Sequence, residues 1–229
     1  MTASLLAGVH AVVFDAVGTL LHPEPTPAEI YAIIGQRFGS QLARSEIKPR
    51  FAAAFALEEV ADRERRLTTD EARERERWRR IVAQVLDDVR DVDGCFQELW
   101  NHFTRPESWR LAPEAPRIVS ALRRRGLATA IASNFDRRLH AVLAGHPLEL
   151  DVVVISSEVG WRKPSPAFFA AVCKSLDLSG EQILFVGDDR VNDYDGAQQA
   201  GLRAVLLDPA GRWVGDGSAR IAHLGELLE

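Results

Sequence analysis

Four short segments of the chain carry side chains that could bind and attack a phosphorylated molecule. They are residues 14–20 (FDAVGTL), 131–134 (IASN), 160–164 (GWRKP) and 185–193 (FVGDDRVND). A carboxylate can act as a nucleophile toward phosphorus or can hold a divalent cation. A serine hydroxyl and a lysine ammonium can bind and neutralise phosphoryl oxygens. Together the four segments could form a site for phosphoryl transfer.

Each segment has an ordinary structural explanation when it is taken alone. Asp15 can form a turn before Gly18, and Ser133 can cap a helix. Lys163 can lie in an exposed turn, and Asp188 can favour the N-terminus of a helix. The functional argument comes from position, because all four segments stand where an expected strand ends. Ligands of open α/β sheets bind at those carboxyl ends.

The strands are predicted by short apolar runs, several of them rich in β-branched residues. These runs are residues 9–14, 127–132, 152–155, 183–186 and 203–207. Runs that are apolar on both faces are typical of parallel strands covered by helices on both sides. Helical patterns accompany the later runs, at residues 113–125, 164–176 and 193–200. This alternation predicts an α/β fold with a doubly wound parallel sheet.

Residues 26–103 differ, because hardly any strand-like run interrupts their helical patterns. A capping box begins at Thr26, with a proline at the first helical position. Phe51 and Phe55 are four residues apart and mark the buried side of a second helix. Trp78 begins the same spacing in a third helix, continued by Ile81, Val82, Val85 and Val89. We expect the aromatic residues of this block to form its core rather than to contact substrate.

Residues 61–80 are densely charged, with eight basic and six acidic side chains. The signs are interleaved, as in residues 74–77 (ERER). Interleaved charges are typical of a solvated helix surface with ion pairs rather than of a nucleic-acid site. An all-helical block is therefore expected directly after the first strand, before the sheet resumes.

The composition is that of a globular protein of 229 residues, with 46% hydrophobic and 27% charged side chains. A net charge of −5 provides no basic field for nucleic acid or an acidic membrane. Cys95 and Cys173 are far apart and form no zinc-ligand spacing, which favours a reduced cytosolic setting. Residues 4–14 are apolar but shorter than the ~20 residues of a membrane span, so we expect a buried first strand there.

The order of the four segments, with a helical block between the first and the second, resembles the haloacid dehalogenase superfamily. The resemblance is to its phosphatase-like branch with a helical cap, and it covers nearly the whole chain from Val9 onward. It implies an α/β core formed by residues 1–21 and 107–229, and a smaller all-helical cap domain formed by residues 22–106. It also implies a hydrolase of small phosphorylated metabolites. We expect a cytoplasmic monomer or weak homodimer.

The resemblance implies roles for the residues that would meet the phosphoryl group. Asp15 would be the nucleophile and would form an aspartyl-phosphate, which splits hydrolysis into two easier steps. Ser133 and Asn134 would bind the phosphoryl oxygens through the serine hydroxyl and nearby backbone N–H groups. Lys163 would neutralise both the nucleophile and the phosphate.

The resemblance also implies a metal ion. Mg²⁺ would be held by Asp15, Asp188 and the main-chain carbonyl of Val17, because hard oxygen ligands suit that ion. Asp193, and in addition Asp189, would orient the ligands or the lysine. Four carboxylates around a single lysine would repel one another and raise each other's pKa, and a divalent cation relieves that repulsion.

The chain departs from the family pattern at Val17. The family's phosphatases usually have a second aspartate there, which protonates the leaving alcohol and then activates water. Valine can do neither, and such help is typically worth 10²–10⁴ in rate, about 3–5 kcal/mol of barrier. We therefore expect a slow phosphatase or one that needs a good leaving group. His22 is the nearest replacement, although a solvent-exposed linker histidine is the simpler explanation.

Three other functions remain open. 2-Haloacid dehalogenases share the first-segment pattern and need no metal, but have a small hydroxyl residue where this chain has Asp188. Phosphonoacetaldehyde-type hydrolysis uses a cap lysine, and the only candidate is Lys48, which we expect to be solvated. A non-catalytic relative that binds a phosphometabolite or a partner protein would explain Val17 but not the other retained residues. Arg162 could add a cation, yet we expect it to point into solvent.

Overall fold

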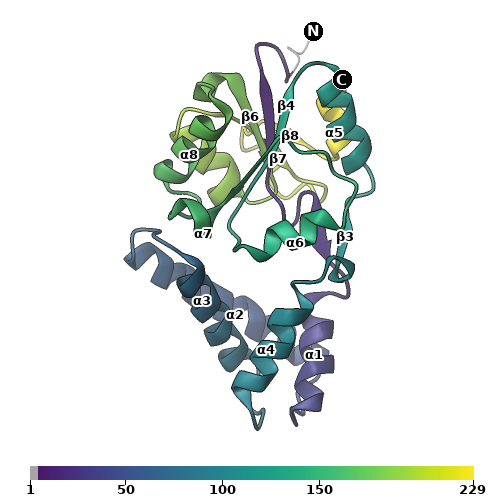
Figure 1. Ribbon diagram of the computed structural model, residues 1–229, viewed down its shortest axis with the longest axis vertical. Helices are drawn as coiled ribbons and strands as arrows, with labels where there is room; N and C mark the ends of the chain where they lie inside the picture. Colours follow the sequence, from purple (N-terminus) through teal and green to yellow (C-terminus); the bar gives the residue numbers. More distant parts are fainter. Residues whose placement is uncertain (1–4) are drawn as a thin grey trace.

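The computed structural model describes residues 5–229, and at its centre lies a six-stranded parallel sheet (Figure 1). The strand order is β5-β4-β1-β6-β7-β8. The strands are β1 (Ala11–Phe14), β4 (Ala128–Ser133), β5 (Val152–Ile155), β6 (Ile183–Gly187), β7 (Arg203–Leu207) and β8 (Arg220–Ile221). The five apolar runs therefore form the strands that they predict. The short β8 was not predicted, and Ser4, where the apolar opening run begins, lies outside the described residues.

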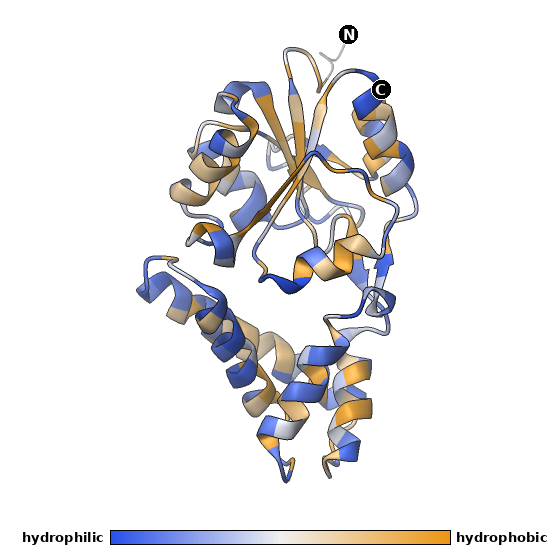
Figure 2. Cartoon of the chain, viewed as in Figure 1, coloured by the Kyte–Doolittle hydropathy of each residue, from blue (hydrophilic) through white to orange (hydrophobic). Residues whose placement is uncertain are grey.

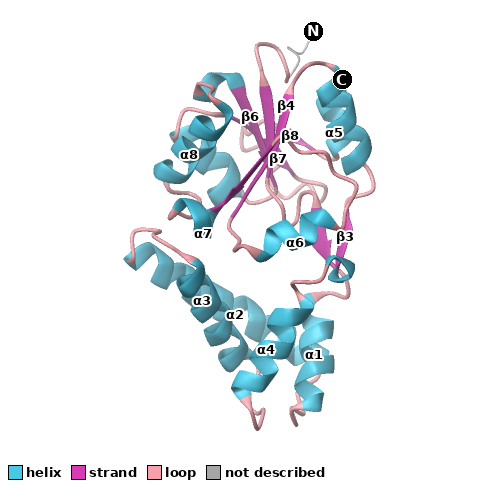
Figure 3. Ribbon diagram, viewed as in Figure 1, coloured by secondary structure: helices cyan, strands magenta, loops and turns pink. Residues whose placement is uncertain are grey.

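Both faces of the sheet are covered, as the doubly wound fold requires (Figure 3). Val12 and Phe14 of β1 belong to one hydrophobic core, whereas Ala11 and Val13 belong to the other. This alternation follows from the two-residue period of a strand. One core is covered by α5 (Ala115–Arg124), α6 (Arg138–Ala144) and the short helix η4 (Leu224–Leu228). The other is covered by α8 (Pro166–Leu176) and α9 (Gly196–Gln199).

Four helices form a separate bundle next to the carboxyl ends of the strands (Figure 1). They are α1 (Pro27–Arg37), α2 (Arg44–Glu64), α3 (Glu71–Val85) and α4 (Val92–His102). Their apolar residues gather between the helices and form a core of their own (Figure 2). The expected capping box is present at α1, where the Glu29 carboxylate accepts the backbone N–H of Thr26 at 2.9 Å. The third predicted helix is shorter than expected, because α3 ends at Val85 and does not reach Val89.

A short antiparallel ribbon connects the bundle to the sheet. It consists of β2 (Leu21–Pro23) and β3 (Trp109–Leu111), which follows the short helix η1 (Pro106–Ser108). The pairing joins segments that are far apart in the sequence, so no local pattern predicts it. None of the helices within residues 5–229 is both long and apolar enough to cross a membrane.

The charged run at residues 61–80 is not simply a solvated surface, which corrects the expectation. Asp62, Arg73, Glu74 and Arg77 are buried and form an ion-pair cluster. Arg73 Nη2 lies 2.6 Å from Asp62 Oδ1, and Arg77 Nε lies 3.0 Å from Asp62 Oδ2. Burial is tolerated because each charge has an opposite partner. The alternation of signs in the sequence does not show which charges turn inward.

Arg162 completes this cluster, and the expectation that it points into solvent is wrong. Its side chain is buried, pairs with Glu74 and lies 3.4 Å from Asp62. Backbone hydrogen bonds join the same parts of the chain, from Arg162 N–H to the carbonyl of Leu67 at 2.9 Å. The helical bundle therefore contacts the segment that immediately precedes Lys163.

Candidate active site

Three neighbouring strands bring the predicted site residues to one edge of the sheet. Asp15 directly follows β1, Ser133 is the last residue of β4, and Asp188 directly follows β6. Because β4, β1 and β6 are adjacent and parallel, their carboxyl ends lie side by side. Lys163 comes from the loop between α7 (Ser156–Val159) and α8, and Asp193 from the π-helix η3 (Arg190–Asp195).

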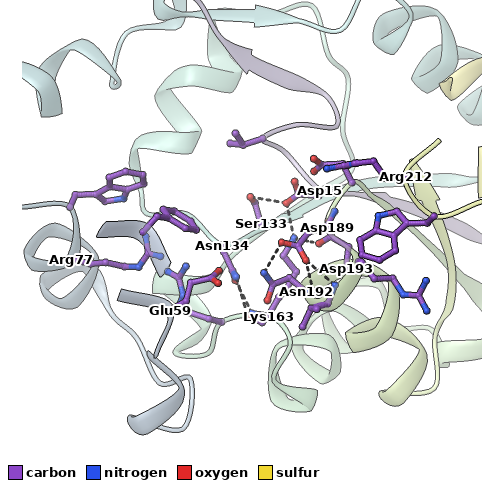
Figure 4. Close-up of a pocket in the computed structure, with 18 residues that line it drawn as sticks. Asp15, Glu59, Arg77, Ser133, Asn134, Lys163, Asp189, Asn192, Asp193 and Arg212 are labelled. Atoms are coloured by element: carbon purple, nitrogen blue, oxygen red, sulfur yellow. Dashed lines mark hydrogen bonds and ion pairs between the residues drawn. The ribbon is translucent and has the colours of Figure 1, made fainter. Parts of the chain in front are cut away.

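Lys163 lies at the centre of the site (Figure 4). Its Nζ donates hydrogen bonds to Asp15 Oδ1 and Asp193 Oδ1, each at 2.6 Å, and to the carbonyl of Ala132 at 3.2 Å. Its side chain is only 3% exposed. Burial lowers the pKa of Lys163, but the two carboxylates outweigh burial and raise it overall. The ammonium therefore stays charged between two carboxylates.

The neighbours of Lys163 hold it and Asp15 in place. Ser133 Oγ donates to Asp15 Oδ1 at 3.1 Å. The Asn134 amide bonds the backbone of Lys163 in both directions, accepting its N–H at 2.7 Å and donating to its carbonyl at 3.1 Å. Both side-chain hydrogen bonds to Asp15 reach Oδ1, which leaves Oδ2 without a partner among the described residues.

The residues present fit a divalent cation. Asp15, Asp188 and Asp193 each offer a carboxylate oxygen, and these oxygens lie within 4.8 Å of one another. Burial and the charges of Asp15 and Asp189 raise the pKa of Asp188 to about 6. Within residues 5–229, Lys163 is the one cation that forms ion pairs with any of these three carboxylates, so an excess of negative charge remains for a doubly charged ion to neutralise. Carboxylate oxygens are the ligands that Mg²⁺ prefers.

Glycine makes the close approach of these carboxylates possible. Gly18 has a φ of +99°, and a Cβ atom there would meet Asp188 Oδ1 at 2.5 Å. A Cβ atom at Gly187 would meet Asp193 Oδ2 at 2.2 Å. Both glycines are needed because the carboxylates occupy the space that any other side chain would fill.

Asp189 lies beside this group and has different partners. Its carboxylate accepts the backbone N–H groups of Val191 at 2.9 Å and Asn192 at 2.8 Å, and the Asn192 side chain at 3.0 Å. It thereby caps the start of η3, which carries Asp193. Of Asp189 and Asp193, only Asp193 forms a hydrogen bond with Lys163.

A cavity of about 440 Å³ opens above Asp15 and includes residues that the sequence analysis did not assign to a site. Phe55 and Trp78 line it from the helical bundle, although they were expected only in the bundle core. Phe55 and Trp78 line the cavity and also pack, partly buried, against the bundle core. Arg212 and Trp213 line the opposite side from the loop after β7. No motif distinguishes that loop, so the sequence contained no signal for them.

Val17, His22 and Lys48 differ in their positions relative to the cavity. Val17 lines the cavity and is 36% exposed. His22 is half-buried on β2, opposite Arg110, rather than in an exposed linker. Burial and Arg110 lower the pKa of His22, and it is not among the described residues that line the cavity. Lys48 is exposed on α2, as expected for a solvated lysine.

Comparison with known proteins identifies the family. Residues 9–201 match the family model of haloacid dehalogenase-like hydrolases. The human haloacid dehalogenase-like hydrolase domain-containing protein 3 is 27% identical over 87% of this chain and 82% of its own length. A phosphoserine phosphatase of Thermus thermophilus is 34% identical, over 56% of this chain and 53% of its own length. A phosphatase of Mycobacterium tuberculosis, MT3486, is 35% identical over 51% of this chain and 55% of its own.

Solved structures show the same fold. The magnesium-bound HAD-hydrolase YfnB from Bacillus subtilis superposes with a TM-score of 0.75 at 19% identity, over 96% of this chain and 97% of that one. The L-2-haloacid dehalogenase from Xanthobacter autotrophicus, with chloropropionic acid covalently bound, superposes with a TM-score of 0.74 at 18% identity, over 96% of each chain. The sheet order, the helical insert and the family match agree: this chain belongs to the haloacid dehalogenase-like hydrolases.

Proposed function

We propose that this hydrolase cleaves small phosphate monoesters with the help of Mg²⁺, through an aspartyl-phosphate on Asp15. The observation that carries the proposal is the buried Asp15 carboxylate, which Ser133 Oγ and Lys163 Nζ contact on the same oxygen. That arrangement leaves Oδ2 as the attacking atom. The phosphatase names of the bacterial relatives support a phosphorylated substrate.

The chain's own residues would divide the reaction into two steps. Asp15 Oδ2 would form a bond to phosphorus while the bond from phosphorus to the ester oxygen breaks, and the leaving oxygen would take a proton from water. A second water would then form a bond to phosphorus while the bond from phosphorus to Asp15 Oδ2 breaks, which releases inorganic phosphate, and the proton of this water would neutralise the hydroxide left by the first step. Lys163 and Ser133 would bind the phosphoryl oxygens, since both already direct donors to this point.

Asp15, Asp188 and the main-chain carbonyl of Val17 would hold Mg²⁺, and Asp193 would keep Lys163 in place. Bound Mg²⁺ supplies positive charge that offsets the negative charge of the phosphoryl group and of the carboxylates. Residues 22–106 would act as a cap, because Phe55 and Trp78 line the cavity opposite the strand ends.

Dehalogenation is the second candidate function, and Val17 is the observation that favours it. A halide leaves without a proton, so a valine at this position would not slow such an enzyme. The carboxylate cluster favours the phosphatase, because a metal-free dehalogenase would have to hold the half-buried Asp188 and the buried Asp193 close to Asp15, with Lys163 as their counter-charge.

A substrate panel with and without Mg²⁺ tests the proposed function. We expect phosphate release from p-nitrophenyl phosphate and acetyl phosphate, with loss of activity when a chelator removes the metal. We expect no chloride release from 2-chloropropionate. Chloride release that the chelator does not affect would instead establish the dehalogenase.

The same experiment has a readout that does not depend on turnover. At about 100 times its dissociation constant, Mg²⁺ should stabilise the folded protein by about 2.7 kcal/mol, which raises the melting temperature by about 5–10 °C. Asp188→Asn should lose both this shift and the activation. The exposed Asp177→Asn serves as the matched control and should keep both. An equal shift in Asp188→Asn would place the cation elsewhere.

Restoring an acid at position 17 should increase the rate for poor leaving groups. We expect Val17→Asp to raise kcat for an alkyl phosphate by about 10²-fold, because a carboxyl group can then protonate the leaving oxygen. The rate for p-nitrophenyl phosphate, whose leaving group needs no proton, should change little. Val17→Asn has a similar size but no acid, and should show no gain. An unchanged or lower rate in Val17→Asp would mean that another group already supplies the proton.

A further inference from the structure

A second cavity, of about 230 Å³, lies beside the candidate site. Val17, Phe55, Trp78 and Asn134 line both cavities, so the two share a wall. We call the second cavity the aromatic pocket, because its other walls come largely from Tyr31, Phe51, Phe96 and Trp100. These residues belong to α1, α2 and α4 of the helical bundle.

The charged and amide groups that line the aromatic pocket are already paired. Its cation, Arg138, forms two hydrogen bonds with the buried Asp136 carboxylate, at 2.7 and 2.6 Å. The Arg138 guanidinium also lies 3.4 Å from the centre of the Trp100 ring. The Asn134 amide is occupied by the backbone of Lys163. The Tyr31 hydroxyl and the indole N–H groups of Trp78 and Trp100 are the polar groups that remain. A charged group in this pocket would therefore lose its hydration without gaining a counter-charge, and a polyhydroxy group would find few partners.

We propose that the aromatic pocket binds the leaving group of the substrate, and that this group is an uncharged aromatic alcohol. The inference rests on the proposed phosphatase function, which places the phosphoryl group at Asp15 and the rest of the ester in the adjoining space. A cavity of roughly 150 Å³ admits benzene in an engineered protein, so the aromatic pocket has room for one ring and its linking carbon. Edge and face contacts with the surrounding rings add to the burial.

The test compares benzyl phosphate with ethyl phosphate. Both are esters of primary alcohols of similar acidity, so the chemical step is matched and the ring is the difference. We expect kcat/KM for benzyl phosphate to be about 30-fold higher, equivalent to about 2 kcal/mol, as for the burial of one phenylalanine side chain. Phosphoserine, with its charged amino-acid group, should be a poorer substrate than ethyl phosphate.

Two variants in helix α2 distinguish an effect of the aromatic pocket from a general loss of activity. Phe51 lines the aromatic pocket but not the cavity above Asp15. Phe51→Ala should lower the ratio of kcat/KM for benzyl over ethyl phosphate by about 10-fold. Leu57 lies on the same helix, is 61% exposed and lines neither cavity, so Leu57→Ala should keep the wild-type ratio. Circular dichroism verifies that both variants are folded.

A measurement on the unaltered protein completes the test. Benzylphosphonate, which cannot be hydrolysed, should inhibit p-nitrophenyl phosphate cleavage with an inhibition constant about 30-fold below that of ethylphosphonate. Equal inhibition constants, or equal kcat/KM values for the two esters, would overturn the aromatic pocket and leave the phosphatase in place. No phosphate release from any ester at any Mg²⁺ concentration would overturn the proposed function and this inference with it.

Discussion

Asp15→Asn should reduce phosphate release by about 10⁴-fold or more, since an amide oxygen cannot replace the carboxylate as nucleophile. The asparagine keeps an oxygen that can accept hydrogen bonds from Ser133 and Lys163, so the surrounding geometry should persist. The substitution also removes one of the carboxylates that crowd this site. We therefore expect the melting temperature of the metal-free variant to equal or exceed that of the wild type, measured by differential scanning calorimetry.

The control for this variant is Asp87→Asn, whose side chain is 61% exposed on the surface of the helical bundle. It should retain full activity. Turnover in ¹⁸O-labelled water adds a chemical readout. In the phosphatase, water attacks phosphorus, so the label should enter inorganic phosphate and leave the peptide that contains Asp15 unlabelled. Label in that peptide would mean attack on the Asp15 carbonyl carbon, as in ester hydrolysis after dehalogenation.

Lys163→Met should destabilise the protein by about 3–5 kcal/mol, because it leaves Asp15 and Asp193 as buried carboxylates without a counter-charge. Methionine preserves the length and apolar stem of the side chain, so the loss reports the ammonium. The rate should also fall by at least about 10²–10³-fold, the usual effect of removing one donor to a reacting oxyanion. Urea unfolding in the presence of a chelator measures the stability.

The surface variant Lys174→Met is the matched control and should lie within about 0.5 kcal/mol of the wild type. A second substitution identifies the cause of the loss. Adding Asp193→Asn to Lys163→Met removes one of the unpaired charges and should recover part of the lost stability, by about 1–3 kcal/mol. Wild-type stability in Lys163→Met alone would show that the ion pairs contribute nothing to folding.

Local sequence patterns predicted the strands of the central sheet well, because these strands are buried on both faces. Each of β1, β4, β5, β6 and β7 is apolar enough on both faces to be recognised without its neighbours. The prediction was less complete where pairing is short and non-local. The ribbon between β2 and β3 and the two-residue β8 depend on partners far along the chain. The helix expected at residues 193–200 begins earlier, as η3, before continuing as α9.

The charged residues illustrate what local patterns omit. Arg73 and Arg77 belong to a helix whose composition suggests full solvation, yet each is buried against Asp62. Arg162 reaches the same aspartate from the loop between α7 and α8. Burial of a charge depends on whether a partner of opposite sign arrives from elsewhere in the fold. The order of residues within one helix does not show whether such a partner is present.

By itself, the sequence determined which chemical groups are available and that they stand at the ends of strands. Asp15, Ser133 and Asp188 could be singled out because each follows an apolar run, and parallel strands bring such ends together. Only the tertiary structure decided that one ammonium is shared by Asp15 and Asp193, and that an aromatic pocket adjoins the site. Distances and cavities arise from packing between distant segments, whereas sequence periodicity reports only the burial of each segment's own face.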